Sequence, residues 1–206
     1  MENKKTRIIL MRHGESAGNS LGIYQGRKFD TGLSELGKKQ AAGAAEFLKS
    51  FSFDKIFTST LPRARETASY VKKFHPTASY AEFRELEERF IGDAEGMPKS
   101  EFGARYPHIL AAWHSGMDAR PEGGESFEDV HMRAIPLIES HIEENAGSAL
   151  LYVAHGDVIR IILGSALKIP FGLQHSIRQD NCALTGLAFD HSKNRWEVEY
   201  VNKRII

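Results

Sequence analysis

The sequence predicts an α/β fold of three layers, in which a mainly parallel sheet carries helices on both faces. Short apolar runs alternate with segments of helical periodicity along the 206 residues, a pattern typical of parallel strands joined by crossover helices. Two of these runs, at 8–11 and 150–154, are apolar at every position, as strands buried on both faces are.

The predicted elements follow in chain order. The first strand covers 6–11. Ser34 is the N-cap of a helix that ends near residue 50, and Pro62 lies in the first turn of the next helix, which ends near residue 74. Ser126 and Asp129 form the capping pair of a long helix that ends near residue 144. The remaining strands are expected at 55–57, 78–83, 149–153, 183–189 and 196–201, with one more helix at 158–167.

The stretch from 88 to 124 fits regular elements least well. It is rich in glycine and proline and holds two short helical segments, at 102–106 and 109–113. A long insertion of this kind is commonly a lid or a binding loop. We therefore expect one domain over 1–206 with a small cap over its site. Most large apolar side chains of the cap should pack it on the core, with one or two facing the substrate: Met97, Phe102, Tyr106, Trp113 and Met117.

Composition narrows the class of protein. Acidic and basic residues balance at 27 each, which argues against a nucleic-acid surface or a polybasic membrane patch. No run approaches the about 20 apolar residues that span a bilayer, and the polar start lacks the apolar stretch of a secretory signal. The single cysteine, Cys182, fits a reducing compartment. We expect a cytoplasmic protein that binds neither nucleic acid nor membrane; the sequence permits a homodimer.

Two strand ends carry histidine. Arg12, His13 and Gly14 follow the first apolar run, and His155 and Gly156 follow a later one. Ligands of open α/β sheets bind outside the carboxyl ends of the strands, so these side chains stand at the usual site position. A lone histidine is more often a packed or surface residue, but two strand-end His-Gly pairs are hard to explain by packing alone. Gly14 is expected to let the chain turn.

A third strand end leads into a helix with Arg63 in its first turn. Helix N-termini attract anions, and the planar fork of a guanidinium suits phosphate oxygens. Arg65 is expected instead to pair with Glu66 on a solvated face. Glu87 and Glu88 supply a candidate carboxylate, and local pattern does not decide between them.

In order along the chain, these motifs resemble those of the histidine phosphatase superfamily, also called the phosphoglycerate mutase-like family. The resemblance spans nearly the whole sequence. Its opening motif is Arg12-His13-Gly14-Glu15 with Asn19, and its second histidine block is His155-Gly156 with Arg160. The other matching segments are Tyr24-Gln25-Gly26, Leu33-Ser34 with Gly37 and Gln40, Ser59 to Ala68, Glu88 with Glu95-Gly96, and Gly123 to Ser126 with Asp129 and Arg133.

The resemblance implies phosphoryl transfer through a phosphohistidine on His13. Arg12, Arg63 and His155 would bind the phosphoryl group. Glu88, which falls at the family's proton-donor position, would protonate the leaving alkoxide and then take a proton from water. The remaining substrate or phosphate contacts are expected from Asn19, Gln25, Gly26 and Gly156.

Charge in the site has predictable consequences for the two histidines. Neighbouring guanidinium groups should lower the pKa of His13 and keep it neutral, whereas His155 should stay or become charged as phosphate binds. Neither a cofactor nor a metal is expected. Two histidines and a carboxylate could in principle hold zinc, but the arginines would repel a cation and no compact His or Cys ligand spacing occurs.

Hydrolysis of a small phosphorylated metabolite is favoured over 2,3-bisphosphoglycerate-dependent phosphoglycerate mutase activity. The segment between Gly96 and Gly123 is shorter than in mutases, which should leave the site open to water. A non-catalytic phosphate-binding scaffold is the alternative of another class, and the intact set of site residues argues against it. Three departures from the family pattern leave specificity open: an extra residue between Gly26 and Asp30, Gly32 in place of proline, and Ala94 in place of an aromatic residue.

Overall fold

A mixed sheet forms the middle of the molecule. The computed structural model describes residues 4–205. Its six strands have the order β3-β2-β4-β1-β5-β6. The pairs β1·β4, β2·β4 and β2·β3 are parallel, and β1·β5 and β5·β6 are antiparallel, which confirms the mainly parallel prediction. The strands are β1 Lys5–Arg12, β2 Lys55–Ser59, β3 Ser79–Phe83, β4 Ala149–Ala154, β5 Leu184–Asp190 and β6 Arg195–Lys203.

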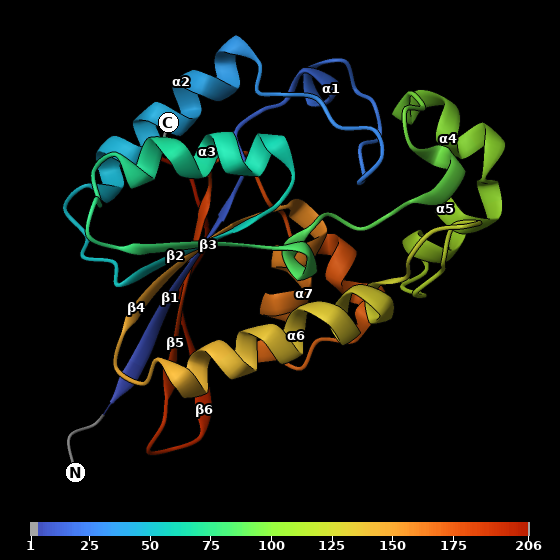
Figure 1. The fold of residues 1–206 in the computed structure, drawn as a ribbon. Coiled ribbons are helices and arrows are strands. Elements are labelled where there is room, and N and C mark those ends of the chain that lie inside the picture. The colour runs from blue at the N-terminus through green and yellow to red at the C-terminus, as the bar shows by residue number, and fades with distance from the viewer. Residues whose placement is uncertain (1–3, 206) are drawn as a thin grey trace.

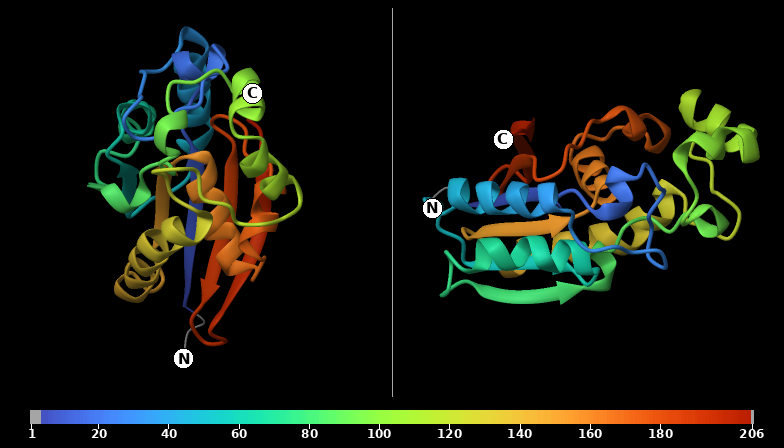
Figure 2. Two further views of the ribbon diagram at one scale, coloured as in Figure 1. Left: turned by 90° about the vertical axis from the view of Figure 1, so that its right-hand side faces the viewer. Right: turned by 90° about the horizontal axis from the view of Figure 1, so that it is seen from above.

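Helices cover both faces of this sheet, as Figures 1 and 2 show. Side chains of a strand alternate between its faces. Ile9 and Met11 of β1 therefore join the cluster under α2 (Glu35–Leu48) and α3 (Pro62–Lys72). Ile8 and Leu10 join the cluster under α6 (Phe127–Glu144) and α7 (Gly156–Ala166). The shorter helices are α1 Ala17–Ser20, α4 Lys99–Arg105, α5 Pro107–His114, η1 Arg84–Leu86, η2 Gly92–Ala94 and η3 Phe171–Ser176.

Helix starts follow their capping chemistry. The Ser34 hydroxyl accepts the N–H of Gly37 over 3.0 Å. Ser126 and Asp129 satisfy each other reciprocally: the Ser126 hydroxyl accepts the Asp129 N–H over 3.2 Å, and the Asp129 carboxylate accepts the Ser126 N–H over 2.7 Å. Helix α7 begins two residues before the predicted start because His155, in extended backbone, is its N-cap.

Gly14 has a different role from the expected one. It does not lie among the glycines of positive φ, so it is not needed to turn the chain. A Cβ at this position would lie 2.5 Å from the carbonyl oxygen of Gly37. The absence of a side chain therefore lets the start of α2 approach the segment that follows His13.

The predicted cap segment has a small apolar cluster of its own. Phe102 and Trp113 stack with ring centroids 5.2 Å apart. The cap lies beyond the carboxyl ends of β1 and β4, on the side of the sheet away from the N-terminus (Figures 1 and 2). Buried members of the cluster are Ile91, Ala94, Met97, Phe102, Ile109 and Trp113. Across 4–205, no helix has both the length and the apolar character that crossing a membrane requires.

Candidate active site

A cavity of about 200 Å³ lies where the carboxyl ends of β1 and β4 meet the cap. Seven of the nine predicted site residues line it: Arg12, His13, Asn19, Gln25, Arg63, Glu88 and Gly156. The other two, Gly26 and His155, lie directly behind this lining, in contact with Arg63 and His13 respectively. Segments far apart in the sequence are thus brought to one place. Further lining residues are Ile23, Tyr24, Arg89, Ile91, Lys99, Asp157 and Arg160.

Hydrogen bonds at both ring nitrogens fix the tautomer of His13. Its Nδ1 lies 2.7 Å from the carbonyl oxygen of Gly14, so Nδ1 carries the proton and Nε2 keeps its lone pair. Arg63 Nε donates to that lone pair over 3.2 Å. Burial, followed by the charges of Arg63 and Arg12, lowers the pKa of His13 well below its usual range. The pKa of His13 is lowered, as expected, but burial contributes more to this shift than the arginines do.

Arg63 is buried and has a partner for each of its nitrogens. Besides His13, it donates to the carbonyl oxygen of Gly26 over 3.1 Å and forms an ion pair with Asp30. Only 1% of its side chain is exposed, and a charge so buried requires such partners. Gly26 therefore acts through its backbone oxygen. Asp30 is a partner that local sequence reasoning missed.

His155 lies beside His13, with ring centroids 5.1 Å apart. Its Nε2 is 2.8 Å from the hydroxyl of Ser59, and its buried Nδ1 has no partner among residues 4–205. Burial, then the charge of Arg63, lowers the pKa of His155 well below its usual range. Of the two expected alternatives, that His155 stays charged or becomes charged as phosphate binds, the lowered pKa disfavours the first, because burial and nearby guanidinium groups favour the neutral imidazole. Its becoming charged as phosphate binds remains a prediction.

Arg12 and Glu88 face each other across Gly156. A Cβ at Gly156 would lie 3.7 Å from Arg12 Nε and 3.8 Å from Glu88 Oε2, so the glycine leaves this space free of side chain. Arg12 is anchored by donating to the carbonyl oxygen of Gln179 over 2.7 Å. Its Nε has no partner in the described part of the chain. That N–H is available for an anion in the cavity.

The structure decides between the two neighbouring glutamates. Glu88 lines the cavity, and its Oε1 accepts the N–H groups of Arg89 over 3.0 Å and Asp157 over 3.2 Å. Burial, and then the charge of Asp157, raises the pKa of Glu88. Glu87 accepts a hydrogen bond from Thr60 and does not line the cavity. Of the two glutamates, Glu88 is therefore the one whose carboxyl group reaches the cavity.

An ion-pair network behind Glu88 was not expected from the sequence. Asp157 accepts Arg89 Nε over 2.8 Å and Arg160 over 2.7 Å. Burial alone would raise the pKa of Asp157, but the two arginines outweigh burial and hold it below its usual range. Lys99, at the start of α4, also lines the cavity, and burial followed by the charge of Arg12 lowers its pKa. The only signal in the sequence was a lysine inside the predicted cap.

The loop that carries Gln25 and Gly26 is fixed by polar contacts. Gln25 donates to the hydroxyl of Thr31 over 2.8 Å. The Glu95 carboxylate accepts three successive backbone N–H groups, from Arg27 to Phe29, over 2.8, 2.7 and 2.9 Å. The extra residue before Asp30 therefore lies in a turn that one carboxylate holds against the cap.

Two further expectations are corrected. Arg65 pairs with Glu82 over 3.1 Å and not with Glu66, because adjacent helical residues do not face each other. Glu66 instead accepts the N–H of Leu33 over 3.1 Å. The expectation that one or two large apolar cap residues face the substrate is also wrong. Of the five named, Met97, Phe102, Trp113 and the partly buried Tyr106 pack within the cap, Met117 is exposed, and none lines the cavity.

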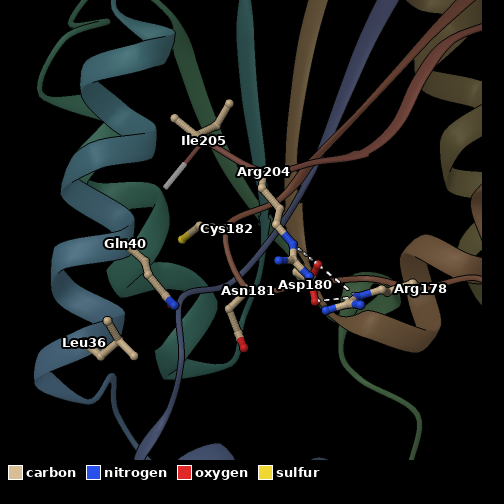
Figure 3. Close-up of a pocket in the computed structure, with 8 residues that line it drawn as sticks. All are labelled: Leu36, Gln40, Arg178, Asp180, Asn181, Cys182, Arg204 and Ile205. Carbon is tan, nitrogen blue, oxygen red and sulfur yellow. Dashed lines mark hydrogen bonds and ion pairs between the residues drawn. The ribbon is translucent and has the colours of Figure 1, made fainter.

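A larger cavity of about 390 Å³ lies on the other side of Asn181 and Cys182. Figure 3 shows Arg178 and Arg204 converging on Asp180 at its rim. None of the nine predicted site residues lines it. Its link to the site is Asn181, whose amide donates to the carbonyl oxygen of His13 over 3.0 Å. No group of three or more His, Cys, Asp or Glu side chains within 4–205 is arranged to hold a metal ion.

Known proteins resemble this chain in both sequence and structure. A family model described as the histidine phosphatase superfamily (branch 1) matches residues 8–203. A metal-independent phosphoserine phosphatase of Arabidopsis thaliana is 33% identical over 165 residues, 79% of this chain and 69% of that protein. A 2,3-bisphosphoglycerate-dependent phosphoglycerate mutase of Cytophaga hutchinsonii is 34% identical over 173 residues, 82% of this chain and 81% of that protein. The native structure of a mycobacterial glucosyl-3-phosphoglycerate phosphatase superposes with a TM-score of 0.87 at 29% identity, covering 97% of this chain and 99% of that one.

Proposed function

This chain belongs to branch 1 of the histidine phosphatase superfamily, and we propose that it hydrolyses phosphomonoesters of small metabolites through a phosphohistidine on His13. It is a phosphoric monoester hydrolase that needs no cofactor. The observation that supports this most strongly is the state of His13: a buried imidazole, neutral, protonated on Nδ1, with the Nε2 lone pair beside Arg63. Such a group is a nucleophile already in its reactive form.

The first step transfers the phosphoryl group. The Nε2 lone pair of His13 attacks phosphorus, and the bond from phosphorus to the leaving oxygen breaks. Arg63, whose Nε donates to that lone pair in the free site, turns this N–H to a phosphoryl oxygen, and the unpartnered N–H of Arg12 binds a second one. Phosphoryl transfer depends mainly on positioning and on stabilising charge at the equatorial oxygens, which these donors supply.

Glu88 handles the proton in both steps. Its raised pKa favours the protonated carboxyl group, which donates its proton to the leaving alkoxide. The resulting carboxylate then takes a proton from the water that attacks the phosphohistidine. The nitrogen–phosphorus bond breaks, inorganic phosphate leaves, and His13 and Glu88 return to their starting states.

The charge of the cavity indicates the class of substrate. Five cationic side chains and two carboxyl groups line it: Arg12, Arg63, Arg89, Lys99 and Arg160 against Glu88 and Asp157. Asp157 forms ion pairs with two of the arginines, Arg89 and Arg160. Among the residues that line the cavity, Lys99 has no carboxylate as an ion-pair partner. We therefore infer a substrate with a second anionic group beside the phosphate, bound by Lys99. A carboxylate fits, as in the phosphoserine and the glucosyl phosphoglycerate named for two relatives.

Mutase activity is the second candidate, because a relative of 34% identity bears that name. The deciding experiment is a screen of phosphate release over a panel of phosphomonoesters with and without a carboxylate, in the presence of EDTA. The proposed hydrolase releases phosphate and prefers the carboxylate-bearing members. The His13→Ala variant is the blank. If none of the phosphomonoesters in the panel releases phosphate, the proposal is wrong.

A further inference from the structure

Ser59 and His155 form a buried pair that the mechanism above does not use. Ser59 ends β2, and His155 follows β4, the neighbouring parallel strand. Their side chains meet at 2.8 Å, between the Ser59 hydroxyl and His155 Nε2, and both residues are fully buried. We propose that Ser59 is a positioning residue that fixes the neutral tautomer of His155, with its ring proton on Nδ1, the nitrogen that contacts the phosphoryl group.

The hydrogen bonds of Ser59 determine the direction of this contact. Its hydroxyl oxygen already accepts the N–H of Leu61 over 3.2 Å. Its single proton has one acceptor among the hydrogen bonds of residues 4–205, which is His155 Nε2. If Nε2 were the donor instead, the hydroxyl proton would stay buried without a partner, which costs about 1–3 kcal/mol. The hydroxyl therefore donates to Nε2, and a neutral ring then carries its proton on Nδ1.

The other ring nitrogen of His155, Nδ1, is the one that can contact a ligand. With Nε2 occupied by Ser59, Nδ1 is the only ring nitrogen left to bind an anion, and it is buried without a partner. In the tautomer set by Ser59 it offers an N–H to a phosphoryl oxygen. In the other tautomer it would present a lone pair, which repels that oxygen.

This inference rests on the proposed function only in assigning the phosphoryl group to Nδ1, since the tautomer itself can be observed without substrate. The experiment is ¹⁵N nuclear magnetic resonance of the protein labelled in histidine, with the His155 signals assigned by loss in His155→Gln. At neutral pH we expect Nδ1 to resonate as a protonated, pyrrole-type nitrogen and Nε2 as a pyridine-type nitrogen. In Ser59→Ala the pattern should shift towards the Nε2-protonated form.

A matched control is available on the same strand. Thr58 is a neighbouring buried hydroxyl whose hydrogen bonds go to backbone oxygens, including that of Val153 over 3.2 Å. Thr58→Val removes a buried hydroxyl of the same strand and should leave the His155 signals and kcat/KM unchanged. Ser59→Ala should lower kcat/KM by about 10–100-fold, at or below the loss measured for one transition-state donor. Ser59→Thr keeps a hydroxyl group at this position and should therefore retain part of the kcat/KM that Ser59→Ala loses.

The outcomes separate this inference from the proposed function. A protonated Nε2 in the wild-type protein overturns the inference whatever the activity, and this measurement does not depend on any variant folding. An Nδ1-protonated ring that is unchanged in Ser59→Ala also overturns it, because Ser59 is then not the cause. If the tautomer behaves as expected but no phosphomonoester is hydrolysed, the proposed function fails while the role of Ser59 in setting the tautomer stands.

Discussion

The backbone N–H of Asp157 donates to the carboxyl group of Glu88 over 3.2 Å, although 69 positions separate the two residues. This contact ties the proposed proton donor to the first turn of α7, directly after His155 and Gly156. It also places the negative charge of Asp157 next to Glu88, which is the second cause of the raised pKa after burial. The proposed acid, Glu88, and His155 are thus positioned by the same helix start.

Replacement of His13 by alanine should abolish turnover, by on the order of 10⁴-fold or more, because no other group supplies the nucleophile. Wild-type protein quenched during turnover of a ³²P-labelled substrate should carry acid-labile label on His13. His108, which is exposed in the cap, offers a matched control, and His108→Ala should retain full activity. Substantial activity in His13→Ala would remove the basis for a phosphohistidine.

The effect of Glu88→Gln should depend on the leaving group. An alkoxide needs a proton from the enzyme, whereas p-nitrophenolate leaves with little help, so kcat on alkyl phosphates should fall by roughly 10²–10⁴-fold and on p-nitrophenyl phosphate by much less. Glu87→Gln is the control, since Glu87 binds Thr60 outside the cavity and should affect both substrates little. Equal losses on both substrates in Glu88→Gln would indicate a structural role.

The acidic and alkaline limbs of the pH profile of kcat/KM should both be displaced from the ordinary pKa values of histidine and glutamate. His13 must be neutral, and its lowered pKa moves the acidic limb below the usual histidine range. Glu88 must be protonated, and its raised pKa moves the alkaline limb above the usual glutamate range. Activity should therefore be lost as pH rises through the pKa of Glu88.

Asp157→Asn tests the cause of the alkaline limb. The substitution removes a negative charge next to Glu88, which lowers the pKa of Glu88. It also leaves the charges of Arg89 and Arg160 unpaired, which lowers that pKa further. The alkaline limb should move to lower pH while the acidic limb stays in place. Thermal unfolding of the same variant controls for lost stability. An alkaline limb that stays in place, or moves upward, would show that Asp157 does not set the ionisation of Glu88.

Lys99 should contribute to the binding of the second anionic group and not to chemistry. Lys99→Met should raise KM for a carboxylate-bearing phosphomonoester by roughly 10–100-fold, the equivalent of about 1.5–3 kcal/mol for a charged hydrogen bond. The KM for p-nitrophenyl phosphate, which has no carboxylate, should change little. Lys28, whose exposed side chain does not line the cavity, provides the control in Lys28→Met. An equal change on both substrates would argue against the assigned contact.

Free phosphate should accumulate without added bisphosphoglycerate, and conversion of 3-phosphoglycerate to 2-phosphoglycerate should be slow. A mutase must exclude water until transfer between two hydroxyls is complete. Phosphate release and a coupled isomerisation assay, run on the same preparation, compare the two activities. Fast bisphosphoglycerate-dependent interconversion with negligible phosphate release would make the mutase the correct assignment.

Much of the fold and part of the site follow from the sequence alone. Apolar runs fix which segments are buried strands, and caps such as Ser34 and Ser126 fix where helices begin, because both depend on contacts within a few residues. The placement of His13 and His155 at strand ends follows from the same local pattern. Since carboxyl ends of parallel strands share one edge of the sheet, the meeting of the two histidines could also be predicted.

Only the tertiary structure decided which neighbours surround these groups. Glu87 and Glu88 are chemically identical and adjacent, and the choice between them depends on the direction in which the chain leaves η1 towards the cap. The pairing of Asp30 with Arg63, and the sharing of Asp157 by Arg89 and Arg160, likewise join segments that no periodicity links. Burial and charge act through space, so the pKa values of His13 and Glu88 became assignable only when packing had brought those segments together.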